Sequence, residues 1–106
     1  MTQKLLIVGC GNMGGAMLAG WLAAGEAPAR FAVLDPALPE APAGVTLYRS
    51  ADEAAGAGHD AVLLSVYAEN YGAQRFYQRY GFAKIADITF QVGEQLDAEF
   101  LYELKL

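Results

Sequence analysis

The feature that most constrains the fold is a glycine-rich stretch, Gly9-Cys-Gly-Asn-Met-Gly14, placed directly after a short apolar run. The run over residues 4–8 is halted by glycine, which is typical of a strand buried on both faces of a parallel sheet. A helix is expected from about residue 13 to residue 24, and Gly25 can cap its end in the left-handed conformation. Its apolar side chains recur at helical spacing: Met13, Met17, Leu18, Trp21 and Leu22.

Further elements of the same kind are expected before residue 67. An apolar run that ends at Asp35-Pro36 predicts a second buried strand. Ser50 can cap a short helix, and Glu53 is placed to complete a capping box. The expected elements are strands over 31–34 and 60–66, a proline-rich loop over 36–43 and a helix over 51–57.

The composition changes after residue 66, because nine of the twelve aromatic residues lie in the remaining part. A helix is expected there, with Asn70 as its N-cap and Gly81-Phe82 ending it in a Schellman motif. Its inner stripe is expected to be Ala73, Phe76, Tyr77 and Tyr80. Its solvent-facing side is expected to be Gln74, Arg75, Gln78 and Arg79.

A hairpin is expected to close the chain. Ala83 and Ile85 share one parity, whereas Ile88, Phe90 and Val92 take the other, so a bulge is predicted near Asp87. Residues 93–97 are expected to form a turn. The final strand is predicted from clean alternation of Phe100, Tyr102, Leu104 and Leu106.

The glycine stretch also carries the candidate site. In the pattern Gly-x-Gly-x-x-Gly, Gly9 permits a tight turn, Gly11 lets a pyrophosphate approach the backbone, and Gly14 lets the helix pack closely on the sheet. The helix N-terminus supplies free N–H groups and a positive dipole end. Asp35, at the end of the second strand, can accept hydrogen bonds from a ribose. The alternative is that the glycines only permit a sharp strand-to-helix turn.

Composition excludes several other classes of function. The formal net charge of −5 argues against nucleic acid or an anionic membrane as a partner. The lone Cys10 excludes an internal disulfide and a cysteine-built zinc site, and the lone His59 excludes a histidine-rich metal site. No apolar run is long enough to span a bilayer. A chain of 106 residues has room for one domain, and a reducing cytoplasm is its expected setting.

Residues 1 to about 66 resemble the N-terminal Rossmann half of pyrroline-5-carboxylate reductase. The likeness is carried by residues 4–22, with the Gly-Asn-Met-Gly sequence, and by the later Asp-Ala-Val-Leu-Leu-Ser-Val stretch. That family reduces pyrroline-5-carboxylate to proline with NAD(P)H. The resemblance implies that Gly9, Gly11, Asn12, Met13 and Gly14 hold the pyrophosphate. Asp35 departs from what a 2′-phosphate requires, and the catalytic, dimer-forming helical domain of the family has no counterpart here.

Residues from about 61 to 106 resemble the C-terminal part of the GNAT N-acetyltransferases. The likeness is carried by Asn70, Ala73, Phe76-Tyr77, Gly81-Phe82 and the closing hairpin. It implies that Asn70 lies near the pantetheine arm and that Tyr77 protonates the departing thiolate of coenzyme A. The pyrophosphate loop of that superfamily is absent. The alternatives, which we favour, are an N-cap role for Asn70 and a core role for Tyr77.

Together the two resemblances predict a chimera whose parts share the strand at 61–66. The acetyltransferase topology, carried over, implies a three-layer αβα sandwich with a five-stranded mixed sheet, order 2-1-3-5-4 and strand 5 antiparallel. We interpret the chain as an engineered or selected recombinant forming one domain over 1–106, monomeric or weakly homodimeric. It is expected to lack catalytic activity and to require no cofactor, with weak NAD binding at the glycine stretch. The alternatives are a working fragment of the reductase or of the acetyltransferase.

Overall fold

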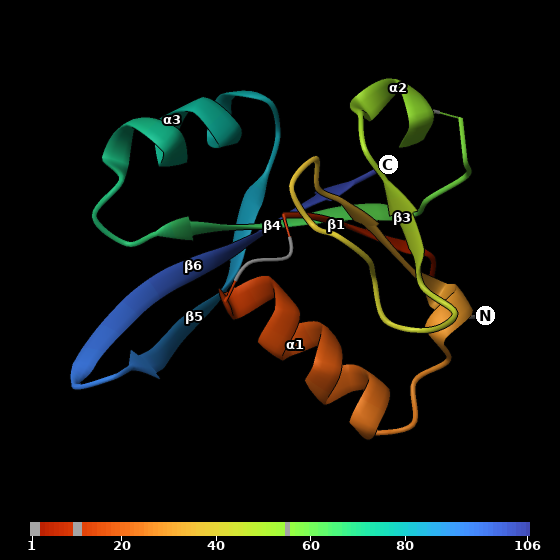
Figure 1. Ribbon diagram of the computed structural model, residues 1–106. Helices are drawn as coiled ribbons and strands as arrows, with labels where there is room; N and C mark the ends of the chain where they lie inside the picture. Colours follow the sequence, from red (N-terminus) through yellow and green to blue (C-terminus); the bar gives the residue numbers. More distant parts are fainter. Residues whose placement is uncertain (1–2, 10–11, 55) are drawn as a thin grey trace.

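The computed structural model describes residues 3–9, 12–54 and 56–106, and it contains one twisted sheet with helices against both faces (Figure 1). In chain order the elements are β1 (Leu5–Val8), α1 (Asn12–Ala23), the 3-10 turn η1 (Pro28–Arg30), β2 (Phe31–Leu34), β3 (Thr46–Tyr48), α2 (Ala51–Ala54), β4 (Ala61–Tyr67), α3 (Tyr71–Arg79), β5 (Ala83–Val92) and β6 (Gln95–Lys105).

The sheet has six strands in the order β3-β2-β1-β4-β6-β5. β1 pairs in parallel with β2 and β4, and β2 pairs in parallel with β3. β6 lies antiparallel between β4 and β5. The expectation of one mixed α/β sheet is confirmed, but five strands in the order 2-1-3-5-4 is wrong. β3 adds an edge strand next to β2, and its three residues are too few to show a strand periodicity.

The sheet buries apolar side chains on both faces, because neighbouring residues of a strand point in opposite directions. On the α1 face, Leu18 is fully buried among side chains of β1, β2, β4 and β6. On the other face, α2 covers β1 and β2, and α3 covers β4 and β6. This second helical cover is thin, because α2 has four residues and none of the residues of α3 is buried. A full three-layer sandwich is therefore not established.

α1 forms close to its expected bounds, and it ends as its sequence predicts. The amide of Glu26 donates to the carbonyl of Trp21 at 3.1 Å, and the amide of Gly25 donates to that of Leu22 at 3.1 Å. Gly25 has a φ of +97°, so the helix ends in a Schellman motif with glycine in the left-handed position. The Trp21 ring stacks on the Phe31 ring with centroids 5.5 Å apart, which fixes α1 on β2.

The ends of α3 are also as expected. The Asn70 side chain accepts a hydrogen bond from the amide of Ala73 at 3.1 Å, which confirms the N-cap. The amide of Phe82 donates to the carbonyl of Tyr77 at 3.1 Å, and the two rings meet with centroids 5.5 Å apart. Gly81, with a φ of +96°, completes the Schellman motif.

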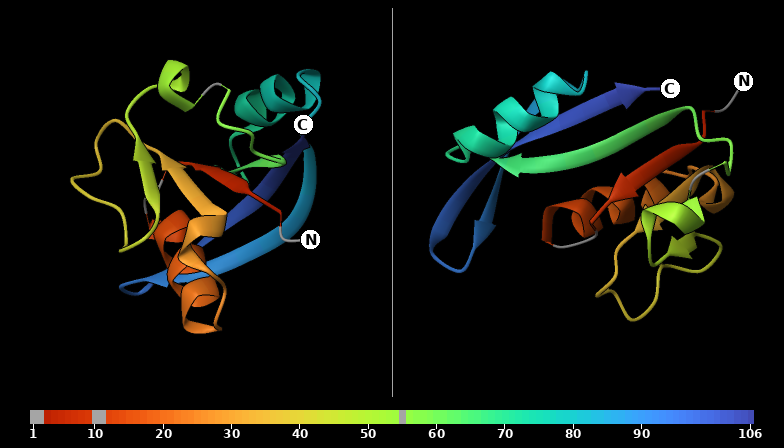
Figure 2. Two further views of the ribbon diagram at one scale, coloured as in Figure 1. Left: turned by 90° about the vertical axis from the view of Figure 1, so that its right-hand side faces the viewer. Right: turned by 90° about the horizontal axis from the view of Figure 1, so that it is seen from above.

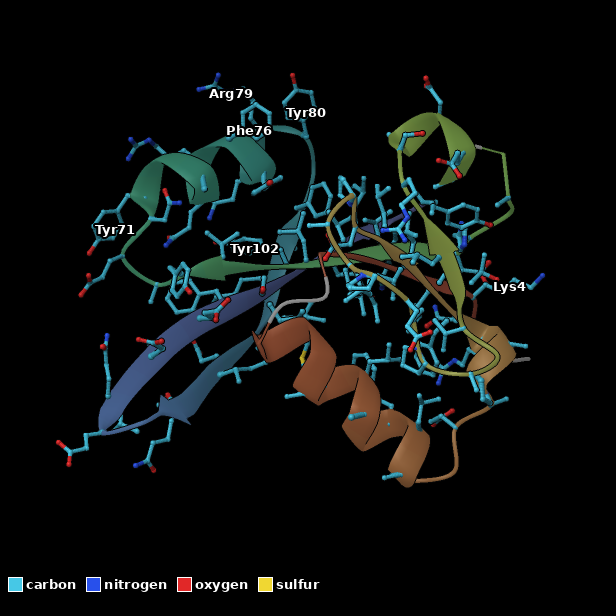
Figure 3. All side chains as sticks on the ribbon, in the orientation of Figure 1. Lys4, Tyr71, Phe76, Arg79, Tyr80 and Tyr102 are labelled. Carbon is cyan, nitrogen blue, oxygen red and sulfur yellow. The ribbon has the colours of Figure 1, made fainter. Side chains whose placement is uncertain are left out.

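The inner stripe expected for α3 is wrong in part. Ala73 and Tyr77 pack against the sheet, but Phe76 and Tyr80 are 52% and 65% exposed. Figure 3 shows Phe76, Arg79 and Tyr80 pointing away from the sheet, and Tyr102 between the sheet and α3.

Hydrogen bonds of two glutamines account for the way α3 is rotated about its axis relative to the expected stripe. Gln78 donates to the hydroxyl of the buried Tyr102 at 3.2 Å, and Gln74 donates to the carbonyls of Tyr67 and Ala68 at 3.1 and 2.9 Å. The buried hydroxyl of Tyr102 needs a hydrogen-bond partner, and Gln78, although exposed, supplies it. The half-buried Gln74 lies toward the sheet, and Phe76 and Tyr80 are left on the exposed side.

The structure also differs from the expected elements in the position of the β5 register shift, the length of α2 and the burial of β6. β5 has a register shift, as expected, but it lies between Lys84 and Ala86, slightly before Asp87, and Ile85 at the shift is half exposed. The described part of α2 is shorter than the helix expected over 51–57, although Ser50 accepts from the amide of Glu53 at 3.3 Å as its cap. β6 buries both parities instead of one, because it lies between two strands and is covered on both faces. Leu106, expected in its apolar stripe, is 71% exposed.

Candidate functional site

The turn after β1 lies where parallel strands end beside one another. Gly9 has a φ of +79°, and its amide donates to the carbonyl of Leu34, the last residue of β2, at 2.8 Å. A non-glycine residue is strained at this φ, so the sequence needs glycine here for the turn itself. Residues 10 and 11 lie outside the described residues, and with them the predicted site residue Gly11. The backbones of Asn12, Met13 and Gly14 form the first turn of α1.

Asp35 follows β2 at the same edge of the sheet. Its amide donates to the carbonyl of Tyr48 at 3.0 Å, which ties the end of β2 to the end of β3. Its carboxylate accepts from the amide of Ala37 at 2.9 Å and thereby shapes the first turn of the following loop. Gly9 donates to Leu34, the residue before Asp35, so Gly9 and Asp35 lie at the same edge of the sheet.

Arg49 is the residue at this edge that sequence reasoning missed. Its guanidinium donates to the carbonyls of Asp35, Pro36 and Leu38 and, at 3.0 Å, to that of Pro39. It therefore holds the loop that follows Asp35 and brings a positive charge close to it. No periodicity in the sequence indicates this role, because Arg49 directly follows β3, and a strand of three residues shows no pattern of its own.

The residues that the acetyltransferase resemblance singles out have structural partners. Asn70 caps α3 through its side-chain oxygen. The Tyr77 ring lies 5.3 Å from that of Phe76 and 5.5 Å from that of Phe82, and it packs on the cluster of Leu64, Val66 and Tyr102. These contacts account for both residues without a ligand.

Gly9 and Asp35 line none of three hollows on the described surface, the smallest of which has about 110 Å³ and lies between Lys4 and His59. The first has about 360 Å³ and is mostly apolar, between α2 and the sheet, with His59 on its wall. His59, for which the sequence suggests no partner, meets the Tyr48 ring edge-on at 6.0 Å. The second hollow has about 470 Å³ and lies between the end of β4 and the tip of the hairpin, with Glu69 and Asp97 among its lining residues. Its two carboxylates make it unsuited to a phosphate group.

The described residues offer no metal centre, since no three His, Cys, Asp or Glu side chains among them are grouped to hold an ion. None of the helices in the described ranges is long and apolar enough to cross a membrane. Glu99 is the buried charged residue of the described chain, and it lies on β6 opposite Tyr67 of β4.

No protein-family model matches the chain, and no curated protein is significantly similar to it in sequence.

Proposed function

We propose that the chain is a recombinant, non-catalytic domain that binds a dinucleotide weakly at the turn between β1 and α1. The observation that carries the proposal is the parallel order β3-β2-β1-β4, in which the chain runs outward from β1 to one side and then returns to its other side. In open α/β sheets a ligand binds at the carboxyl ends of the strands where the order reverses in this way. Gly9 lies at that point.

The join between the two segments is supported by the pairing of β4. Leu5–Val8 of β1 pairs with β4 on one side, and β6 pairs with it along all seven residues on the other. β4 thus contacts strands from both segments, which is the arrangement that a crossover within 61–66 would produce. The proposal leaves the reductase and the acetyltransferase as whole enzymes aside, because neither resemblance covers a complete active site.

The nucleotide preference follows from the charges at the end of β2. Asp35 can accept from a 2′-hydroxyl and repels a 2′-phosphate, so NAD⁺ is favoured over NADP⁺. Arg49 moderates this preference, because its guanidinium lies against the Asp35 carbonyl. Past β4, the antiparallel β6 takes the place where a dinucleotide-binding domain continues with parallel strands. Only about half of a dinucleotide is enclosed, and a Kd of roughly 0.1 mM or weaker is expected.

A titration followed by amide NMR tests the binding. NAD⁺ is expected to shift the amides of Gly9 and Gly14 and to leave that of Gly93, in the distant hairpin turn, unmoved. NADP⁺ is expected to bind more weakly, and Asp35→Asn should narrow the difference, because it removes the repelling charge. Unmoved Gly9 and Gly14 signals at saturating NAD⁺, or tighter binding of NADP⁺, would show that the glycines serve only the turn.

Catalysis is expected to be absent in two assays. Neither NAD(P)H-dependent reduction of pyrroline-5-carboxylate nor acetyl transfer from acetyl-coenzyme A to amines should exceed the uncatalysed rate. The reason is that one resemblance lacks its catalytic domain and the other its coenzyme loop. Acetyl transfer that disappears in Tyr77→Phe would contradict this expectation and restore the acetyltransferase interpretation.

A further inference from the structure

The outward face of α3 combines exposed aromatic rings with charged side chains. Tyr71, Phe76 and Tyr80 are 63%, 52% and 65% exposed. The Phe76 ring is held by Tyr77 at 5.3 Å and Tyr80 at 5.0 Å, so it is already ordered for contact. In the view from above, α3 lies in front of the strands and none of the other described elements covers it (Figure 2, right). Arg79 and Glu69 form no ion pair within the described residues.

The spacing of these residues makes the face complementary to itself. Gly72, Phe76 and Arg79 lie within about 60° of one another around the helix. An added Cβ at Gly72 would meet only the Asn70 side-chain oxygen, at 4.0 Å, so the helix surface is open there. Gly72 and Phe76 lie two residues to either side of Gln74, and Glu69 and Arg79 lie five residues to either side. Glu69 precedes the N-cap Asn70, so it lies just beyond the first turn of α3.

We propose that α3 is the contact face of a weak homodimer in which two copies of the helix cross antiparallel at the level of Gln74, whose own side chain lies toward the sheet. In that arrangement the Phe76 ring of each copy lies over Gly72 of the other, where the absent side chain lets the helices approach closely. Arg79 of each copy comes level with Glu69 of the other, giving two equivalent ion pairs across a two-fold axis.

The size of the face sets the strength of this contact. α3 has nine residues and a length of about 14 Å, so the buried area lies at the low end of the range for specific interfaces. Dissociation constants of roughly 10 µM to 1 mM are expected. The overall charge of −5 per chain adds repulsion, so the association should strengthen with moderate salt until the ion pairs are themselves screened.

Sedimentation equilibrium of the full-length chain up to about 1 mM tests the proposal. Phe76→Ser, Arg79→Glu and Glu69→Arg are each expected to weaken the dimer by about ten-fold or more, whereas the double variant with both charges exchanged should return to within about three-fold of the original. Circular dichroism checks that each variant is folded. Leu96→Ser removes a 67% exposed side chain from the hairpin, and Lys105→Glu makes the same change of charge as Arg79→Glu; neither should weaken the dimer.

The proposed dimer does not depend on nucleotide binding at the glycine turn, so the failure of one proposal can be told apart from the failure of the other. A chain that stays monomeric at the highest concentration overturns it. A dimer that persists in Phe76→Ser, or single charge changes that the double variant fails to reverse, places the contact elsewhere and overturns it as well. An association disrupted equally by Leu96→Ser indicates non-specific contact of apolar surface and has the same consequence.

Discussion

Leu18→Ala is expected to lower the free energy of unfolding by about 3–4 kcal/mol, because it empties a fully enclosed position in the core. Leu18 is fully buried, and α1 is fixed to the sheet chiefly through it and the partly buried Met17, Trp21 and Leu22. Alanine leaves a cavity under a short helix that cannot collapse without leaving the sheet. Domains of this kind have about 5–15 kcal/mol of stability, so a large share is lost. Urea unfolding followed by the fluorescence of Trp21 measures the change.

The same variant tests whether the chain is one cooperative unit. The cluster around Leu18 includes Leu101 of β6, and Ala86 and Ile88 of β5 pack against it, so the core on the α1 face connects β1 and β2 with the C-terminal hairpin. Hydrogen exchange of β5 and β6 amides should therefore accelerate by as much as that of β1 amides. Loss of protection confined to residues before 67 would instead show two separable units. Leu96→Ala, at an exposed position, should change stability by less than about 0.5 kcal/mol.

Gly44→Ala is expected to destabilise the fold by about 2–4 kcal/mol, whereas Gly20→Ala should stabilise it by up to about 1 kcal/mol. Gly44 has a φ of +84°, and an added Cβ would lie 2.8 Å from the Cβ of Pro28. The strain is local and the contact is with a rigid ring, so neither can relax cheaply. Gly20 lies within α1, and an added Cβ there meets nothing within 4 Å.

The pair of substitutions makes the test internally controlled, because the chemical change is the same at both sites. Thermal unfolding of the two variants, measured side by side, gives the difference directly. Equal effects of the two substitutions would mean that the turn before β3 does not have the backbone conformation described. A destabilising Gly20→Ala alone would mean that the outer side of α1 is covered.

The elements with strong local signals were predictable from sequence. The apolar runs of β1, β2 and β4 stop at residues that cannot continue a strand, and α1 and α3 carry their own caps in Gly25, Asn70 and Gly81. β3 was not predictable, because a three-residue strand gains its stability from pairing with β2 rather than from its own pattern. Sequence patterns therefore predict the elements whose start and end are determined by residues within or next to them.

The orientation of α3 shows the opposite case. Its apolar stripe favours Phe76 and Tyr80 as core residues, but Gln78 donates to the hydroxyl of the buried Tyr102, and Gln74 donates to the carbonyls of Tyr67 and Ala68. Those acceptors are brought under the helix by tertiary structure, so no periodicity within the helix can indicate them.

The residues of the candidate site also differ in how far the sequence could predict their positions. Gly9 and Asp35 could be placed together from sequence, because parallel strands end at the same edge. Arg49 could not, because its place beside Asp35 depends on β3, which the sequence pattern did not reveal.

The irregularity in β5 has a consequence for the solubility of the chain. β5 is an outer strand of ten residues, and an outer strand of that length offers its free N–H and C=O groups to any other extended chain. The register shift at Ile85 interrupts that row, and the ion pair of Lys84 with Asp87, 2.8 Å apart, places two charges next to the interruption. A bulge and charged side chains on an outer strand both disfavour pairing with a second strand along the whole edge. The sheet is thereby protected from growing, edge upon edge, into a fibril.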